Sequence, residues 1–78
     1  MHRTTLTLSY DSVRTASIVE RSVAVEVGDI EGDRTEARID REGATVTVDV
    51  TAADLVALRA GQNTWLSLLE VAERAADH

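Results

Sequence analysis

The 78-residue sequence has no cysteine and no phenylalanine, and its only aromatic residues are Tyr10 and Trp65. Without cysteine, neither a disulfide nor a thiolate metal site can form. The core has to be built from valine, leucine, isoleucine and alanine, and a chain this short buries only about 60% of the surface that its unfolded form exposes. We therefore expect one domain, residues 1–78, with a thin core that gains stability by burying more surface against a partner.

Long apolar runs and lysine are also missing. No run is long enough for a signal peptide or a membrane span, so we expect a cytoplasmic protein without membrane contact. All eight basic residues are arginine, and 14 acidic residues bring the net charge to -6. Such a composition resembles proteins of salt-in halophiles, in which salt screens the repulsion between carboxylates to within about 3 Å at 1 M. The same charge disfavours strong binding of nucleic acid by the chain alone.

Residue types for catalysis or metal binding are scarce. The only histidines, His2 and His78, lie at the termini, where order is poorest, so the usual catalytic triads and zinc sites are excluded. Alternating acids in residues 29–33 resemble the start of a calcium loop, but Arg34 replaces the required glycine and the closing acid, Asp40, falls in a predicted strand. We expect no enzymatic activity, no metal and no cofactor.

Three segments alternate between apolar and polar residues, as half-buried strands do. They are residues 3–10, 35–40 and 44–50, and the last two flank a short turn that contains Gly43, which predicts a β-hairpin. One face of the resulting sheet carries threonine, serine and charged residues. Both helices are therefore expected to cover the other face.

Two segments have helical spacing. Residues 13–27 follow an N-cap at Asp11 or Ser12, and a second helix is predicted over residues 51–75, where Asp54 completes a variant capping box. The order β-α-β-β-α predicts an α+β fold, a three-stranded sheet with two helices packed on one face. Five residues of the first helix share its expected sheet-facing side: Val13, Ala16, Val19, Val23 and Val27.

The middle of the second helix, residues 61–64, contains poor helix formers. Either a loop joins two short helices there, or one continuous helix keeps Gly61 for another reason. A glycine within a helix costs about 1 kcal/mol relative to alanine, but it lets another backbone come close. We favour the continuous helix, because a helical wheel places six residues on one buried arc. They are Leu58, Gly61, Trp65, Leu68, Leu69 and Ala72.

Each helix also has a second, milder apolar stripe away from its core side. In the first helix this stripe is Ile18 and Val25, seven residues apart. Exposed apolar side chains can be mere scatter, or they can form a docking surface for the helices of another protein. We favour the docking surface because the core is thin. The stripe of the second helix comprises Val56, Ala60, Asn63, Ser67 and Val71.

The pattern D-L-x-x-L-R-A-x-x-N-T at residues 54–64, after a valine hairpin with a glycine turn, resembles the Pcc subunit family of the KEOPS complex, the family of the CTAG tumour antigens. The resemblance covers almost the whole chain, and the composition suggests a haloarchaeal-like member. Gly61 departs from the alanine or serine typical of that position.

The resemblance implies a non-catalytic, homodimeric scaffold for the complex that makes threonylcarbamoyladenosine in tRNA. Its two helices would pack against two helices of the catalytic sugar-kinase-like subunit, and tRNA would be reached only through the assembled complex. The main alternative is a free-standing KH-like RNA-binding domain, although the required G-x-x-G loop is missing; a third is a small-molecule regulatory module. The expected partner-binding residues are Ile18, Val25, Val56, Arg59, Ala60, Asn63, Ser67 and Val71.

Overall fold

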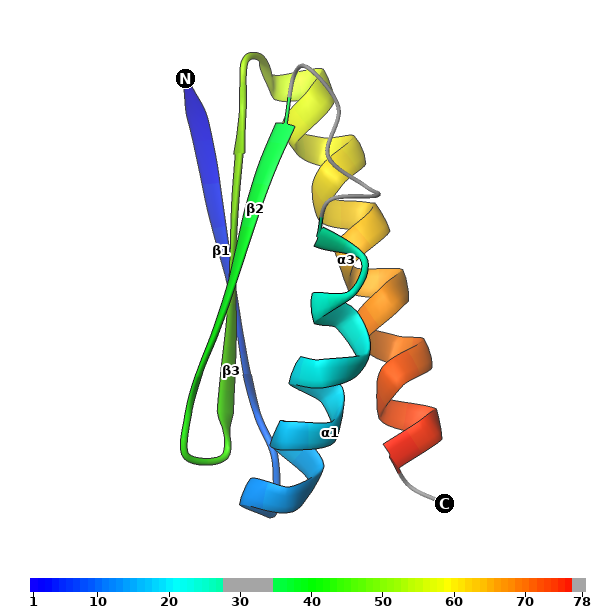
Figure 1. Ribbon diagram of the computed structural model, residues 1–78. Helices are drawn as coiled ribbons and strands as arrows, with labels where there is room; N and C mark the ends of the chain where they lie inside the picture. The colour runs from blue at the N-terminus through cyan, green and yellow to red at the C-terminus, as the bar shows by residue number, and fades with distance from the viewer. Residues whose placement is uncertain (28–34, 77–78) are drawn as a thin grey trace.

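The computed structural model describes residues 1–27 and 35–76. These residues form a three-stranded antiparallel sheet in the order β1-β3-β2, and both helices lie on one face of it (Figure 1). The predicted β-α-β-β-α architecture is thus confirmed, whereas the loop and the weak calcium pattern of residues 28–34 lie outside the described residues. The elements are β1 (His2–Ser9), α1 (Val13–Ala24), β2 (Thr35–Glu42), β3 (Thr45–Ala52) and α3 (Leu55–Ala76).

The strands follow the alternation of the sequence. In the paired register, Leu6 of β1 lies opposite Val48 of β3, which in turn lies opposite Ile39 of β2. All three side chains point toward the helices, and Val48 is fully buried. The turn between β2 and β3 contains Gly43 with a φ of 61°, a left-handed conformation that glycine adopts without steric cost. The hairpin and the alternation of its strands are therefore as predicted.

Helix α1 begins after Ser12, whose Oγ accepts a hydrogen bond of 3.1 Å from the backbone N–H of Thr15. Ser12 rather than Asp11 is thus the N-cap, and the helix ends at Ala24, three residues earlier than predicted. Val13 was predicted on the core side but is 54% exposed. It lies in the first turn and is rotated by about 60° from the next core position, so it turns away from the sheet.

Helix α3 begins later than predicted. Its N-cap is Asp54, whose Oδ1 accepts a hydrogen bond of 2.8 Å from the N–H of Ala57. The predicted start at Thr51 is wrong, because the chain stays extended to Ala52 and pairs with both neighbouring strands there. A threonine followed by an acid three residues later fits a helix start, but threonine also suits a strand, and sheet pairing decides between them.

The second helix is continuous through Gly61, as predicted. Gly61 is buried against the sheet, and a Cβ atom there would lie 3.2 Å from Cγ1 of Val50 and 3.7 Å from Cγ2 of Thr35. The close neighbours are therefore side chains of the sheet rather than the backbone that we expected. The small residue lets the helix approach β3 closely, while Trp65 and Leu69 fill the centre of the core.

Candidate docking surface on the helix layer

Exposed apolar side chains are concentrated on the helices. In the strands, the outward positions carry threonine, serine and charged residues, and none of the large apolar side chains there is exposed. Among the described residues, the exposed large hydrophobic side chains apart from Met1 all belong to the two helices or to the residue that follows α1: Val13, Val25, Leu55, Val56, Leu66 and Val71.

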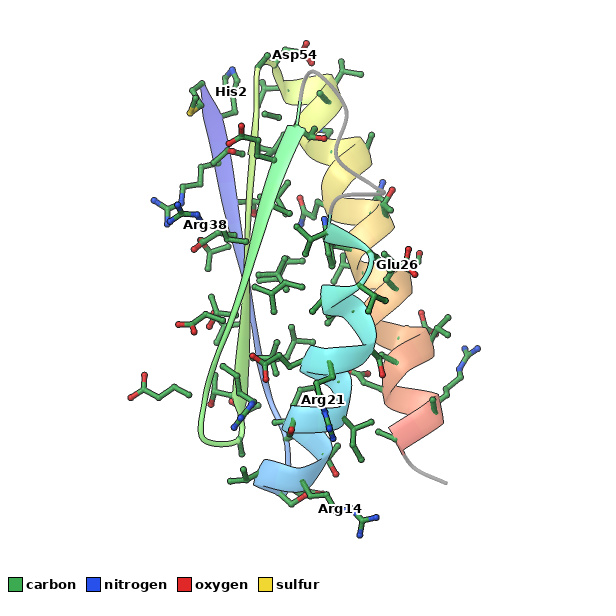
Figure 2. All side chains as sticks on the ribbon, in the orientation of Figure 1. His2, Arg14, Arg21, Glu26, Arg38 and Asp54 are labelled. Atoms are coloured by element: carbon green, nitrogen blue, oxygen red, sulfur yellow. The ribbon has the colours of Figure 1, made fainter. Side chains whose placement is uncertain are left out.

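The outward side of α1 presents one regular stripe. Arg14, Ile18, Arg21 and Val25 are separated by four, three and four residues, which places them on one face of a helix. Val25 is 71% exposed, both arginines are exposed, and Ile18 is half-buried. Figure 2 shows Arg14 at the start of α1, extending away from the molecule, and Arg21 further along the helix.

The outward side of α3 presents the second stripe. Val56 is 77% exposed, and Ala60, Asn63, Ser67 and Val71 are exposed as well. Arg59 is also exposed, but it lies at the edge of this stripe, on the side of α3 that carries Leu55 and Leu66. Thr64 lies beside this stripe, and its hydroxyl donates a 2.9 Å hydrogen bond to the carbonyl of Ala60. A threonine that bonds to its own helix in this way needs no other partner, which explains how it is tolerated in the middle of α3.

The two stripes adjoin because α1 and α3 run antiparallel and pack side by side (Figure 1). Ile18 illustrates the contact, since it lines a shallow depression together with Thr15 of α1 and with Ala75 and Ala76 at the end of α3. The eight predicted partner-binding residues thus lie outside the buried core, on neighbouring helices. We call the outward stripes of α1 and α3 together the docking surface.

Ion pairs neutralise some arginines but not those of the docking surface. Arg14, Arg21 and Arg59 are exposed, and none forms an ion pair within the part of the chain that the structure describes. Among the described residues, ion pairs join Arg3 to Asp49 at 3.1 Å, Arg41 to Glu20 at 2.8 Å and Arg74 to Glu70 at 2.9 Å.

The uncovered face of the sheet is polar and internally bonded. Asp49, at the centre of β3, accepts hydrogen bonds from the Thr5 hydroxyl and from the Arg3 guanidinium. These bonds, from Thr5 first and Arg3 second, hold the pKa of Asp49 below its usual value. Asp49, Thr5 and Arg3 therefore satisfy one another on this face.

A second exposed apolar pair lies on the flank of α3 and was missed by the sequence reasoning. Leu55, Leu66 and Glu73 are separated by 11 and 7 residues, so they share one side of the helix. The carboxylate of Glu73 accepts a hydrogen bond of 2.7 Å from the hydroxyl of Tyr10, the residue after β1. Partial burial and this carboxylate raise the pKa of Tyr10 well above its ordinary value. Leu55 and Leu66 therefore lie on the flank of α3 that faces β1.

The two edge strands differ in charge. In β2, five of the eight residues are charged, and such charges discourage pairing with another strand. In β1, with the sequence HRTTLTLS, Arg3 is the one residue that is always charged. The edge of β1 is thus a regular, nearly uncharged strand with two leucines on the neighbouring helix flank.

Within the described residues, no group of three or more histidine, cysteine, aspartate or glutamate side chains could hold a metal ion. The same residues contain no helix with the length and hydropathy needed to cross a membrane.

A family model described as transcription factor Pcc1 matches residues 3–77. The chain belongs to the Pcc1 family. Pcc1 proteins are accessory subunits associated with KEOPS and are generally non-catalytic, so the resemblance found in the sequence is confirmed. A chain in the crystal structure of the binary complex Gon7-Pcc1 has the same fold: the TM-score is 0.84 at 18% identity, over 97% of this chain and 93% of that chain. No curated protein matches the sequence.

Proposed function

We propose that this Pcc1-family chain is a single-domain, non-catalytic and cytoplasmic scaffold of a KEOPS complex. It supports threonylcarbamoyladenosine modification of tRNA by binding the catalytic sugar-kinase-like subunit through α1 and α3, and it meets tRNA only within the assembled complex. The observation that carries this proposal is the docking surface, where exposed apolar side chains form two adjoining helical stripes outside the domain's own core.

The composition of the docking surface suits helix packing. Val25, Val56 and Val71 supply apolar area, and fully burying one such side chain contributes about 1.5–3 kcal/mol. Ala60 and Ser67 are small, so ridges of a partner helix can approach the backbone of α3 closely. Two partner helices laid along α1 and α3 would form a four-helix contact, in which each stripe faces an apolar ridge of the partner.

The test is a single substitution at the centre of the α3 stripe. Ala60→Arg should leave the fold nearly intact, because the two residues have similar helix propensities at an exposed site. It should weaken binding of the purified catalytic subunit at least a hundredfold, because a bulky charge would be desolvated without a mate. Isothermal titration calorimetry of wild type, Ala60→Arg and the matched control Thr47→Arg, on the uncovered sheet face, measures this. A folded Ala60→Arg that binds like Thr47→Arg would refute the docking surface.

We further propose that the scaffold is a homodimer formed through the edge of β1. A regular, nearly uncharged edge strand leaves N–H and C=O groups ready to pair with another strand. Two β1 strands related by a twofold axis would pair antiparallel and join two sheets into one of six strands. Leu55 and Leu66 of both copies would then lie near the new contact, where burial stabilises them.

The related Pcc1 protein of the solved structure forms a binary complex with Gon7. For this chain we favour a second copy, since the edge of β1 and its leucines are available in every protomer. A free-standing RNA-binding domain is disfavoured by the net charge of -6. If it were correct, the isolated chain would bind bare tRNA more tightly than it binds the catalytic subunit.

A further inference from the structure

The docking surface is cationic although the chain as a whole is acidic. Arg14 and Arg21 of α1 are exposed there, and neither has an ion-pair partner among the described residues. Two of the three acids within α1 and α3 are paired with arginines, and Glu26, which follows Val25, is turned by about 100° from it around the helix axis. Glu20 binds Arg41, Glu70 binds Arg74, and Glu73 accepts the hydrogen bond from Tyr10.

We infer that the docking surface selects an acidic partner surface: a helical face whose carboxylates pair with Arg14 and Arg21 beside an apolar centre. The inference rests on the proposed function and adds to it the charge of the partner's contact face. Guanidinium groups suit this role, since they are weakly hydrated and bind carboxylates through two parallel hydrogen bonds.

The spacing along α1 restricts the partner further. Arg14 and Arg21 are two helical turns apart, which corresponds to about 10 Å along the axis. Ile18 lies between them and Val25 lies one turn beyond. A partner helix that runs along α1 therefore needs acidic residues about seven positions apart, with apolar residues between them. Such a helix satisfies the charges and covers the apolar side chains at once.

The interleaved apolar side chains favour a protein over a nucleic acid. A phosphate backbone would neutralise Arg14 and Arg21 but offer nothing apolar to Ile18 and Val25. The net charge of -6 also repels a polyanion at longer range. A protein face that is acidic only where it meets the arginines avoids both problems.

The experiment measures the affinity of the purified catalytic subunit for charge-reversal variants. Arg14→Glu and Arg21→Glu are each expected to weaken binding about tenfold, and the double variant by more, because attraction is replaced by repulsion. The matched control is Arg38→Glu on the uncovered sheet face, which changes the net charge equally and should alter affinity less than twofold. In the double variant, the effects on α1 stability oppose each other, because an acid is favourable near the helix start and unfavourable near its end.

The outcomes are distinct. If the reversal variants have the melting temperature of wild type and bind the catalytic subunit about as well as Arg38→Glu does, the inference is wrong and the proposed function stands. If wild type does not bind the subunit, both the inference and the proposed function are wrong. If bare tRNA binds wild type and loses affinity in the double variant, while subunit binding is unaffected, the arginines read phosphate and the inference is wrong. Should a reversal variant unfold, Arg14→Gln and Arg21→Gln replace it. Their affinity for the catalytic subunit is again compared with that of the Arg38 variant, and a smaller loss of affinity is expected.

Discussion

The uncovered face of the sheet and the docking surface of the helices both lie at the molecular surface, yet they are built from different side chains. On the sheet, Asp49 is bonded by Thr5 and Arg3, and the remaining outward positions are mostly threonine or charged residues. On the helices, Val25 and Val56 stand exposed beside arginines that have no ion-pair partner among the described residues.

The difference shows which surface is adapted to water. An outward helix position accepts glutamate, glutamine or arginine without any loss of helix propensity, so valine and isoleucine there are not required by the fold. An outward strand position favours β-branched residues, and the sheet uses threonine, the polar one. The outward positions of the sheet are thus polar, whereas the outward positions of the helices include apolar side chains that the domain itself does not bury.

The largest effect should come from exchanging the two sides of α3. Leu58 is 9% exposed and faces the sheet, so Leu58→Arg buries an unpaired charge and should lower the free energy of unfolding by at least about 4 kcal/mol, enough to unfold the domain. Ala60→Arg, two residues away and exposed, should change it by less than about 0.5 kcal/mol. Thermal melts followed by circular dichroism measure both. Equal unfolding of the two variants would mean that position 60 belongs to the core.

A second pair of variants separates the two apolar surfaces of α3 from each other. Light scattering of wild type at micromolar concentration in molar salt should give twice the chain mass of 8.5 kDa. Leu66→Glu, on the flank beside β1, should give a monomer that still binds the catalytic subunit, because a carboxylate would be desolvated at the dimer contact. Val71→Glu, on the docking surface, should remain a dimer and lose subunit binding. A monomeric wild type would remove the proposed dimer.

A smaller effect is expected from salt. Fourteen acids against eight arginines repel one another when screening is removed, so the melting temperature should be lower in 0.05 M than in 2 M KCl. Replacing Arg14 and Arg21 by glutamate should deepen the loss in dilute salt, since each replacement makes the net charge of -6 more negative by two. Identical melting curves in the two salts would contradict the halophilic interpretation.

The smallest effects should appear at the extremes of pH. Folding raises the pKa of Tyr10 above its unfolded value of about 10, so its contribution to stability is complete below that pH and declines as the pH rises further. Tyr10→Phe should lower the free energy of unfolding by about 1 kcal/mol at neutral pH, because the hydrogen bond to Glu73 is lost, and it should not show this decline at alkaline pH.

Folding lowers the pKa of Asp49, so the contribution of Asp49 to stability is lost as the pH falls below about 4. Asp49→Asn should therefore flatten the acid side of a stability profile.

Local patterns were enough to predict much of the molecule. Period-two alternation located the strands, and the phase that joins Leu58, Trp65 and Leu69 showed that α3 is continuous despite Gly61. The same phase predicted the exposure of Val56 and Val71. These features depend on neighbours within a few residues, which is the range over which a periodic pattern carries information.

Features that depend on distant segments were not predictable in this way. The pairing of Thr51 with both β1 and β2 moved the start of α3, and it involves residues far away in the sequence. The bond from Tyr10 to Glu73, 63 positions apart, likewise has no local signature. The spacing of 11 residues between Leu55 and Leu66 could have shown that they share one side of α3. That this side lies beside the edge strand β1 depends on the packing of distant segments, which the spacing does not show.

The strand order also has a consequence for how the protein is made. His2 of β1 pairs with Ala52 of β3, which the ribosome adds 50 residues later. At a synthesis rate of about 5–20 residues per second, β1 waits several seconds without its pairing partner. The β2–β3 hairpin, in contrast, closes across a two-residue turn and can form within microseconds of leaving the exit tunnel. In crowded polysomes, β1 is therefore the segment of the nascent chain most open to chaperones and to the β1 strands of neighbouring nascent chains.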